Sequence, residues 1–343
     1  MSIRFGLGPF SGQLPPGDPR SHADEYADTL ALARLAEELG FDSFWVTEHH
    51  GAADGYLPSL LVALAAVAAV TERIALGTAV ALAPLQHPLR FAEDCAVVDQ
   101  LSRGRLIVGL GAGWRKEEFR AFGVRIEERV ARTIELARTC RRAWDEGSVG
   151  DGTAVTPRPF GRLPLLLGGT VARAARRAGS VADGFIGTPP TKVGGSESLR
   201  LFRSLVAEFD AGARDAGRDP RALPLAFHMN AWVSPSGALD TGVRAAMWHQ
   251  IGTYSAWHAR DEGQAATDEL PPVDDEAIAR RTWMGAPREV IAQASPWIDA
   301  FAERDLHVIV RLHYPGMRRE TAERALRLFA TEVMPALRRR AAS

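Results

Sequence analysis

The sequence is a repeating alternation of short apolar segments and longer segments whose apolar residues have helical spacing. Eight of the short segments have the composition of buried strands, and helical pattern follows each of them. They lie at residues 3–8, 42–47, 74–80, 105–110, 163–168, 183–187, 223–234 and 307–313. Strand–helix–strand units join parallel strands by right-handed crossovers, and eight such units close more naturally into a barrel than into an open sheet. The sequence therefore predicts a (β/α)8 TIM barrel in which residues 1–343 form one domain.

The segment 239–285 departs from this rhythm. It contains short stretches of helical pattern, is interrupted at Gly252 and at Pro271-Pro272, and is rich in Trp, His and Tyr. Because glycine and proline commonly break helical pattern, we expect several short helices here. We treat residues 235–285 as a divergent insertion region of the barrel.

Composition and charge exclude several classes of protein. The 41 basic and 42 acidic residues leave a formal net charge of −1, which argues against nucleic acid as a partner. The most apolar run, Leu57–Val70, is too short to span a bilayer. Two cysteines, Cys95 and Cys140, are too few for a disulfide framework. Because the N-terminus also lacks the pattern of a signal peptide, we expect a cytoplasmic protein that binds no membrane.

A barrel of this kind carries its active site at the C-terminal ends of its strands. In this chain those ends are unusually polar or glycine-rich. They comprise residues 47–50, 79–83, 110–113, 168–170, 187–188, 230–232 and 311–313. The barrel prediction therefore gathers these positions on one face of the molecule.

The segment Glu48-His49-His50 is the strongest candidate for catalysis among these strand ends. Because successive residues of a strand point to opposite faces, His49 is predicted to share a face with Trp45, and His50 to share the other with Glu48. An imidazole titrates near neutral pH and suits proton transfer, but partly buried histidines that bond backbone carbonyls would give the same pattern. A metal site at His49, His50 and His87 is disfavoured because adjacent histidines on a strand diverge and no HExxH pattern accompanies them.

Several motifs resemble those of a known family. They read VTEHH at 46–50, GTAVALAPLQHPLRFAEDCAVVDQLSRGRLIVGLGAGWRKEEFRAFG at 77–123, LLLGGT at 165–170 and VMPAL at 333–337. Together they resemble the bacterial luciferase-like flavin monooxygenases, densely over 41–124, more weakly over 163–187 and 285–337, and thinly over 189–284. The resemblance implies a (β/α)8 barrel, usually dimeric, that uses FMN or the deazaflavin F420.

The resemblance also implies roles for individual residues. His49 matches the catalytic histidine of the family. The bond that matches Ala79–Val80 is, in relatives, a non-proline cis peptide lying against the flavin ring, although an ordinary buried strand end would have the same sequence. The turn Gly168-Gly169-Thr170, with Arg173 in the helix that follows, matches the turn that receives the flavin phosphate. Exposed amides at a helix N-terminus suit an anion, but many such turns bind nothing.

The glycine-rich run Gly109–Gly113 invites comparison with a dinucleotide-binding fingerprint. That fingerprint follows the first strand of its fold and needs an acid after the second, whereas this run follows the fourth strand. A Cys-Arg pair stands in the luciferase α-type pattern where this chain has Gly111-Ala112, so Thr170 and Arg173 must contribute more to phosphate binding. Because GAGW also occurs in F420-dependent branches of the superfamily, the identity of the flavin stays open.

A substrate pocket is predicted from histidines and aromatic residues near the same strand ends. The candidates are His50, His87, Trp114, Trp232 and Trp257, and aromatic residues at helical spacing are also common in protein cores. Trp248, Tyr254 and His258 could wall the same space. The mobile loop of luciferase is shortened between Trp257 and Gly285, which argues against light emission.

The resemblance implies a two-component monooxygenase. Reduced FMN, supplied by a separate flavin reductase, would react with O2 to give a C4a-peroxyflavin that oxygenates a small organic substrate, with His49 as general acid or base. The chain is expected to form a homodimer. The alternatives are an F420-dependent dehydrogenase or reductase on the same barrel and a flavin-binding protein without turnover. The substrate is left open, because its contacts fall in the divergent segment 189–284.

Overall fold

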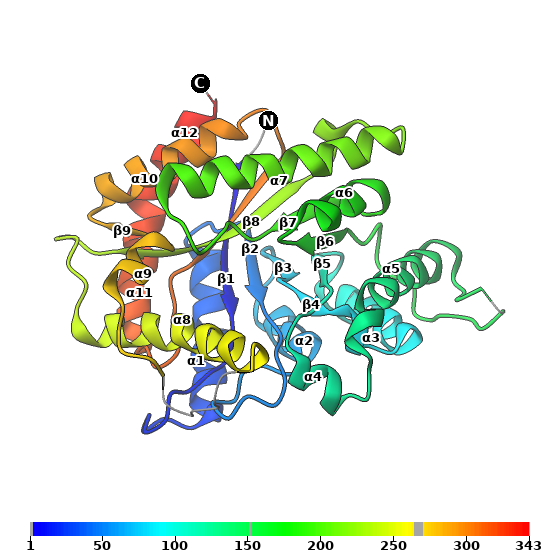
Figure 1. Ribbon diagram of the computed structural model, residues 1–343, viewed down its shortest axis with the longest axis horizontal. Helices are drawn as coiled ribbons and strands as arrows, with labels where there is room; N and C mark the ends of the chain where they lie inside the picture. The colour runs from blue at the N-terminus through cyan, green and yellow to red at the C-terminus, as the bar shows by residue number, and fades with distance from the viewer. Residues whose placement is uncertain (1–2, 151, 264–269, 343) are drawn as a thin grey trace.

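The computed structural model describes residues 3–150, 152–263 and 270–342, and its centre is a closed barrel of parallel strands (Figure 1). The barrel strands are β1 (Ile3–Phe10), β2 (Ser43–Val46), β3 (Ala75–Thr78), β5 (Leu106–Gly111), β6 (Leu165–Gly169), β7 (Gly184–Gly187), β8 (Leu225–Val233) and β10 (Leu306–Arg311). Each pairs in parallel with the next, and β10 pairs with both β8 and β1, which closes the barrel. The predicted (β/α)8 fold is confirmed.

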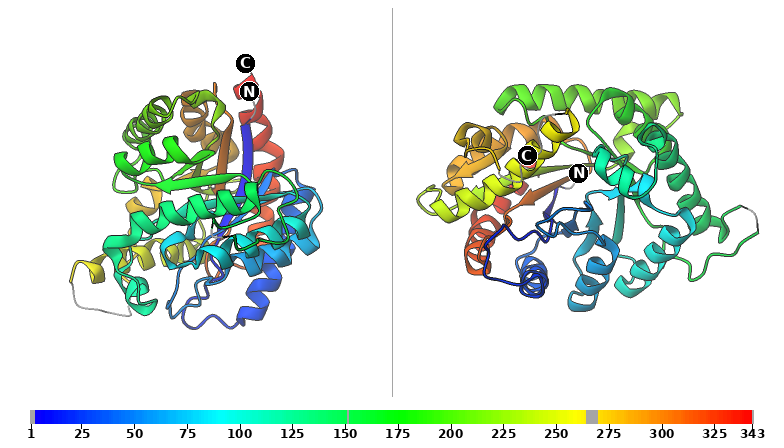
Figure 2. Two further views of the ribbon diagram at one scale, coloured as in Figure 1. Left: turned by 90° about the vertical axis from the view of Figure 1, so that its right-hand side faces the viewer. Right: turned by 60° about the horizontal axis from the view of Figure 1, so that its bottom comes forward.

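Helices surround the barrel, as the two further views show (Figure 2). They are α1 (His22–Glu38), α2 (Leu60–Val70), α3 (Pro88–Ser102), α4 (Lys116–Ala121), α5 (Arg129–Glu146), α6 (Ala172–Val181), α7 (Gly195–Asp215), α8 (Thr241–Asp261), α9 (Asp275–Arg280), α10 (Pro287–Ala300), α11 (Arg319–Leu328) and α12 (Met334–Ala342). Their apolar sides pack on the outward-facing strand residues in one large core cluster. Within the described ranges, none of these helices combines the length and the apolar character needed to cross a membrane.

The inside of the barrel is filled by a second, smaller apolar cluster around Trp45 of β2. The indole fits because the neighbouring strands carry glycine: a Cβ at Gly77 would lie 2.1 Å from the Trp45 ring, and one at Gly6 would lie 2.6 Å from its Nε1. The indole Nε1 donates to Ser43 Oγ at 2.6 Å. The barrel is therefore a packed core below its C-terminal opening, and a ligand can enter only at that opening.

The divergent region differs from the expectation in two ways. Helix α8 runs unbroken through Gly252, where a short series of helices was expected. One glycine costs a helix only about 1 kcal/mol, and α8 offsets this by burying a long face that includes Met247 and Ile251. A further strand, β9 (Thr282–Gly285), extends β8 by pairing with residues 230–233. Its four residues are too few to show a strand pattern. Part of the region, residues 264–269, lies outside the described residues.

Candidate functional site

His49 lies at the C-terminal opening of the barrel, three residues after β2 ends at Val46. The loop that carries it is fixed by the buried carboxylate of Glu48. That carboxylate accepts hydrogen bonds from the backbone N–H of Leu82 at 2.6 Å and from Gln86 Nε2 at 2.9 Å. Its Oε1 also lies 2.9 Å from His50 Nε2. The strand alternation therefore holds beyond β2, since Glu48 and His50 face one another and His49 faces elsewhere.

The imidazole of His49 is oriented by a second buried carboxylate, Glu118 of α4. His49 Nδ1 lies 2.8 Å from Glu118 Oε1, which also accepts the backbone N–H of His50 at 2.8 Å. An ionised carboxylate can only accept hydrogen bonds, so we assign the Nδ1 proton to His49 and leave Nε2 as an acceptor in the neutral ring. The other oxygen, Glu118 Oε2, is buried with no partner among the described residues. A buried oxygen of this kind suits a donor group supplied by a bound ligand.

The second ring nitrogen of His49 meets a pair of tyrosines. His49 Nε2 lies 3.1 Å from Tyr254 Oη on α8, and Tyr254 Oη lies 2.8 Å from Tyr56 Oη. Glu118, His49 and Tyr56 are 1%, 5% and 2% exposed, whereas Tyr254 is partly exposed. His49 and Tyr56 of the loop after β2, Glu118 of α4 and Tyr254 of α8 thus form one hydrogen-bonded chain, and Tyr254 is its one partly exposed member.

Aromatic rings enclose His49. Ring centroids of Tyr56, Trp257, Tyr254 and Trp114 lie 4.8, 4.9, 5.4 and 6.3 Å from that of the imidazole. All four make edge-on contacts, which aromatic rings favour over face-to-face stacking. The imidazole is therefore shielded from bulk water by apolar surface.

Arg115 ties the loop after His49 to α8. Its Nη1 donates to the carbonyl of His50 at 2.5 Å, and its guanidinium lies 4.3 Å from the centroid of the Trp257 ring. Its Nη2 pairs with Glu117 Oε2 at 2.6 Å. A buried arginine with these partners holds Trp257 against His49 by a cation–π contact.

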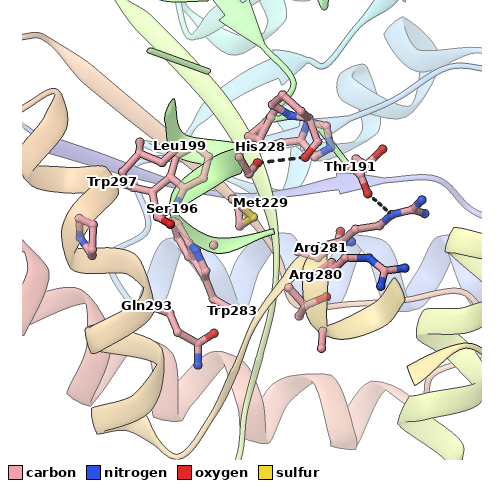
Figure 3. Close-up of a pocket in the computed structure, with 18 of the residues that line it drawn as sticks. Thr191, Ser196, Leu199, His228, Met229, Arg280, Arg281, Trp283, Gln293 and Trp297 are labelled. Atoms are coloured by element: carbon pink, nitrogen blue, oxygen red, sulfur yellow. Dashed lines mark hydrogen bonds between the residues drawn. The ribbon is translucent and has the colours of Figure 1, made fainter. Parts of the chain in front are cut away.

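A pocket of about 340 Å³ opens beside this cluster, between the loop after β7, the ends of β8 and β9, and helices α7 and α10 (Figure 3). Two adjacent arginines lie on its rim. Arg280 is ion-paired with Glu276 and Asp274. Arg281 donates from Nε to the carbonyl of Thr191 at 2.9 Å and, within the described residues, has no carboxylate partner. Burial lowers the pKa of Arg281. A half-buried cation with no carboxylate in contact among the described residues suits an anionic ligand.

His228 of β8 forms part of the wall of the same pocket. It shares the inward face of β8 with Ala226, which belongs to the barrel interior. Burial lowers the pKa of His228 to about 4, and the positive charge of Arg311 on the adjacent strand β10 adds to this effect. His228 is therefore a neutral hydrogen-bonding group at neutral pH.

His258 of α8 links the pocket and the His49 cluster, because it packs on Trp114 and interacts with the charge of Arg281. The His258 ring stacks on Trp114 with centroids 3.9 Å apart. Burial lowers the pKa of His258, and the positive charges of Lys192 and Arg281 lower it further. The basic edge of the pocket therefore lies close to the aromatic wall around His49.

The expected cis peptide between Ala79 and Val80 is present. Both residues are partly exposed and lie on the apolar cluster that fills the barrel. The surroundings of Val80 require glycine, since a Cβ at Gly111 would lie 2.4 Å from Val80 Cγ2 and one at Gly168 would lie 3.2 Å from Cγ1. The result is a flat, partly exposed apolar surface of the kind on which a flavin-type ring can lie.

The turn after β6 presents free polar groups. Helix α6 begins after Val171 without a side-chain cap, so its first backbone N–H groups lack a capping partner. Thr170 and Arg173 are exposed, and no hydrogen bond or ion pair joins either side chain to another described residue. A Cβ at Gly169 would lie 2.6 Å from Ala174 Cβ, so glycine allows the helix to start this close to the strand. These features fit the phosphate of a flavin or deazaflavin.

Comparison with protein families supports the fold and the site together. The model of the luciferase-like monooxygenase family matches residues 7–304. The chain belongs to this family. The match covers the barrel strands from β2 to β8 in full and the second half of β1, and it includes the residues around His49.

Relatives of this luciferase-like chain use different cofactors. An F420-dependent glucose-6-phosphate dehydrogenase of Kineococcus radiotolerans is 31% identical over 325 residues, which cover 90% of this chain and 92% of that one. The crystal structure of monooxygenase RslO1 from Streptomyces bottropensis has a TM-score of 0.77 at 27% identity and covers 98% of this chain and 99% of its own. The FMN complex of 3,6-diketocamphane monooxygenase from Pseudomonas putida also has a TM-score of 0.77, at 19% identity and 98% coverage of both chains, and shares the fold. The luciferase-like chain is thus similar to both types of oxidoreductase.

The luciferase-like barrel brings together most, but not all, of the predicted site residues. Trp114 and Trp257 pack around His49, and His50 bonds Glu48 within the loop that carries His49. Two predicted pocket residues do not join this group. His87 is exposed at the N-terminus of α3, and Gln86 contacts the site instead. Trp232 packs in the main core, with its Nε1 bonded to the carbonyl of Ala238. A position near a strand end does not determine the direction of the side chain, and a pocket role for these two residues stays a prediction.

Sequence reasoning missed four residues of the luciferase-like site: Glu118, Tyr56, Arg115 and Arg281. Glu118 is 69 positions from its partner His49, so no local spacing connects them. The available signal is that Arg115 and Glu118 follow the glycine turn after a barrel strand, where catalytic groups gather. For Tyr56 and Arg281 the sequence carries no comparable signal.

The two adjacent histidines of the luciferase-like site have separate partners. His49 bonds Glu118 and Tyr254, while His50 bonds Glu48 and packs on Phe122. Across the part of the chain that is described, no three His, Cys, Asp or Glu side chains are arranged to hold a metal ion. Each of the two imidazoles therefore has its own carboxylate partner.

Proposed function

We propose that this protein is a monooxygenase that uses reduced FMN and O2 to oxygenate a small organic substrate. The observation that carries the proposal is the buried His49–Glu118 pair beside the partly exposed surface of Ala79 and Val80. Reduced FMN, when bound, would supply the electrons that convert O2 into an oxygen donor. Glu118 would hold the His49 ring and give a positive charge on it a counter-charge. His49 would then move a proton to or from the reacting oxygen.

Exclusion of water supports oxygen transfer. The rings of Tyr56, Trp114, Tyr254 and Trp257 surround His49, and α8 covers them from outside. An enclosed apolar site protects reactive species from hydrolysis and unwanted protonation. Hydride transfer between two organic molecules needs this protection less, so the enclosure favours the oxygen-dependent reaction.

Candidate positions for the cofactor follow from the same geometry. The ring would lie on Ala79 and Val80, and the phosphate would contact the free N–H groups at the start of α6, Thr170 and Arg173. A helix N-terminus favours anions through its dipole and its free amides. We further propose that a separate reductase supplies the reduced flavin.

A second candidate is an F420-dependent dehydrogenase that acts on a phosphorylated sugar. The relative from Kineococcus radiotolerans carries that name over nearly its whole length. In this chain the half-buried Arg281 gives the pocket an unpaired cation that a substrate phosphate would match. The enclosed His49 supports the first candidate, and Arg281 supports the second.

The experiment that separates the candidates measures cofactor binding and oxygen uptake on one preparation. Reduced FMN and reduced F420 are titrated anaerobically, and each complex is then mixed with O2. We expect binding of reduced FMN and rapid O2 consumption, without reduction of F420 by glucose 6-phosphate. Binding of F420 alone, together with its reduction by the sugar phosphate, would instead establish the dehydrogenase. A chain that binds FMN but whose His49→Ala variant changes no rate would be a flavin carrier.

A further inference from the structure

The acid–base chain at the site does not end at His49. We propose that Tyr254 is the group that exchanges a proton directly with the substrate, and that His49 supplies and receives that proton from behind it. The inference rests on the proposed oxidoreductase function, but it concerns residues of this chain alone. It adds a catalytic residue from the divergent region, where sequence comparison is least informative.

Access to the substrate is the first argument. Both ring nitrogens of His49 are occupied, Nδ1 by Glu118 and Nε2 by Tyr254. The imidazole is also covered by rings on several sides and is 5% exposed. Among the four hydrogen-bonded side chains Tyr254 alone is partly exposed, so it is the member of the chain that lies nearest to a molecule in the opening. A substrate reaches His49 directly only if Tyr254 moves away.

The direction of the hydrogen bonds is the second argument. Because His49 keeps its proton on Nδ1 and donates it in a hydrogen bond to Glu118, the neutral ring accepts at Nε2 from the Tyr254 hydroxyl. The Tyr254 oxygen in turn accepts from Tyr56. When His49 is protonated, Nε2 becomes a donor. The bond to Tyr254 then reverses, and the Tyr254 hydroxyl is free to donate to another acceptor. Protonation of His49 thus prepares Tyr254 to act as an acid without movement of heavy atoms.

The proton step balances within these groups. In the acid direction, the O–H bond of Tyr254 breaks and its proton goes to an oxyanion on the reacting molecule. The Nε2–H bond of the protonated His49 breaks at the same time, and that proton replaces the one lost by Tyr254. His49 ends neutral with Nδ1–H still donated to Glu118, Tyr254 ends as it began, and no electrons are transferred between protein groups.

The charges around the tyrosines suit transient negative charge on Tyr254. Burial raises the pKa of Tyr254 and that of Tyr56, and the positive charge of Arg311 on β10 opposes the rise in both. Arg311 donates to Gln250 of α8 and to Ser11, and it has no carboxylate partner within the described chain. Its field therefore stabilises the partial negative charge that develops on the Tyr254 oxygen while the proton passes.

Negative groups oppose this effect from two directions. Glu118 of α4 acts on Tyr254, and Asp54 of the loop after β2 acts on Tyr56. Asp54 bonds His249 Nε2 at 2.8 Å and Gln13 Nε2 at 2.7 Å, which distributes its charge. Arg115 lies 3.8 Å from Glu118 Oε1 and offsets part of that carboxylate. Tyr254 thus lies between the negative charge of Glu118, behind His49, and the positive charge of Arg311.

The decisive variant is Tyr254→Phe, which removes one oxygen and keeps the ring contacts with His49 and Trp257. We expect turnover to fall about 100-fold, the low end for loss of a positioned acid or base, with unchanged affinity for the reduced cofactor. The solvent deuterium isotope effect and the pH dependence of turnover should both change, because the step that moves the proton changes. Tyr26→Phe, on the exposed surface of α1, is the matched control and should behave as the wild type.

A measurement on the cofactor-free protein tests the bond itself. The ¹⁵N NMR spectrum of the imidazoles should show His49 with its proton on Nδ1 and a hydrogen-bonded, unprotonated Nε2. In Tyr254→Phe the Nε2 resonance should move toward the value of a free acceptor while the Nδ1 proton stays. A wild-type His49 protonated on Nε2 would overturn the proposal, since Tyr254 could not then be its donor.

Failure of the inference is distinguishable from failure of the proposed function. If the wild type consumes neither cofactor nor O2, the proposed function is wrong, and the NMR result still decides the hydrogen bond. If the wild type is active and Tyr254→Phe keeps its rate, isotope effect and pH profile, the function stands and the role of Tyr254 is refuted. Full activity of Tyr254→Phe combined with an inactive His49→Ala would show that the substrate reaches His49 directly.

Discussion

His49 and His228 both lie at the C-terminal opening of one barrel, yet their surroundings are opposite. His49 is bonded to Glu118 and lies one residue from Glu48, so the side of the opening near β2 carries the carboxylates. His228 lies near Arg311, in the wall of a pocket whose rim carries the unpaired Arg281. The same side chain therefore has a carboxylate partner at one position and a positively charged neighbour at the other.

This difference assigns separate tasks to the two sides of the opening. A histidine with a buried carboxylate partner suits proton transfer, because the counter-charge stabilises the imidazolium that forms during the step. A pocket with a neutral histidine and an unpaired arginine suits the binding of an anion. Helix α8 joins the two sides through Tyr254, which contacts His49, and His258, which lies near Arg281.

The largest expected effect is the loss of the histidine on the acidic side. His49→Ala should lower turnover by roughly 100- to 10,000-fold, the range for a positioned acid–base group. His228→Ala, on the basic side, should leave the proton step intact and act mainly on substrate affinity. Steady-state rates at saturating reduced cofactor measure both variants. Equal losses of turnover in His49→Ala and His228→Ala would contradict the assignment of separate tasks to the two sides of the opening.

The next effect concerns pH and stability on the basic side. The pKa of His228 is lowered to about 4 in the folded protein, from about 6.5 when unfolded. The unfolded state therefore binds the extra proton first, and the stability that neutral His228 contributes is lost as pH falls from about 6.5 toward 4. The loss should reach at most about 3 kcal/mol at pH 4. His228→Gln has no titrating ring and should lack this part of the acid destabilisation.

Urea unfolding of wild type and His228→Gln at pH 7 and pH 4 measures this difference, because carboxylates titrate equally in both. Urea unfolding of His49→Gln and wild type at the same two pH values provides the corresponding comparison for the acidic side. Identical pH dependence of His228→Gln and wild type would mean that His228 is not held neutral by the fold.

The smallest of these effects should come from the pocket rim. Arg281→Ala should weaken binding of a phosphate-bearing ligand by about 10- to 100-fold, since a hydrogen bond to a charged group contributes about 1.5–3 kcal/mol. Arg280→Ala is the matched control, because Arg280 is already paired with Glu276. Titration with FMN and with glucose 6-phosphate shows which ligand the rim binds. If Arg281→Ala and Arg280→Ala weaken ligand binding equally, the affinity depends on the net charge of the pocket rather than on Arg281 itself.

The fold was predictable because its signals are local and repeated. Apolar residues at strand and helix spacing recur eight times, and each unit can be recognised within about 40 residues. His49 was predictable for a related reason, since it directly follows a strand whose C-terminal end must face the opening. Local signal was weak or misleading at two places: Gly252 does not interrupt α8, and Trp232 packs in the core.

The sequence pattern by itself determined the barrel and the place of His49 at its opening, and the resemblance to known relatives supplied the family and the cis peptide. Only the tertiary structure decided what those groups can do. Glu118 and Tyr254 lie 69 and 205 positions from His49, and Arg281 has no carboxylate in contact among the described residues. The physical reason is that hydrogen bonds and desolvation act over a few ångströms of space, whereas sequence pattern reports only on neighbours along the chain.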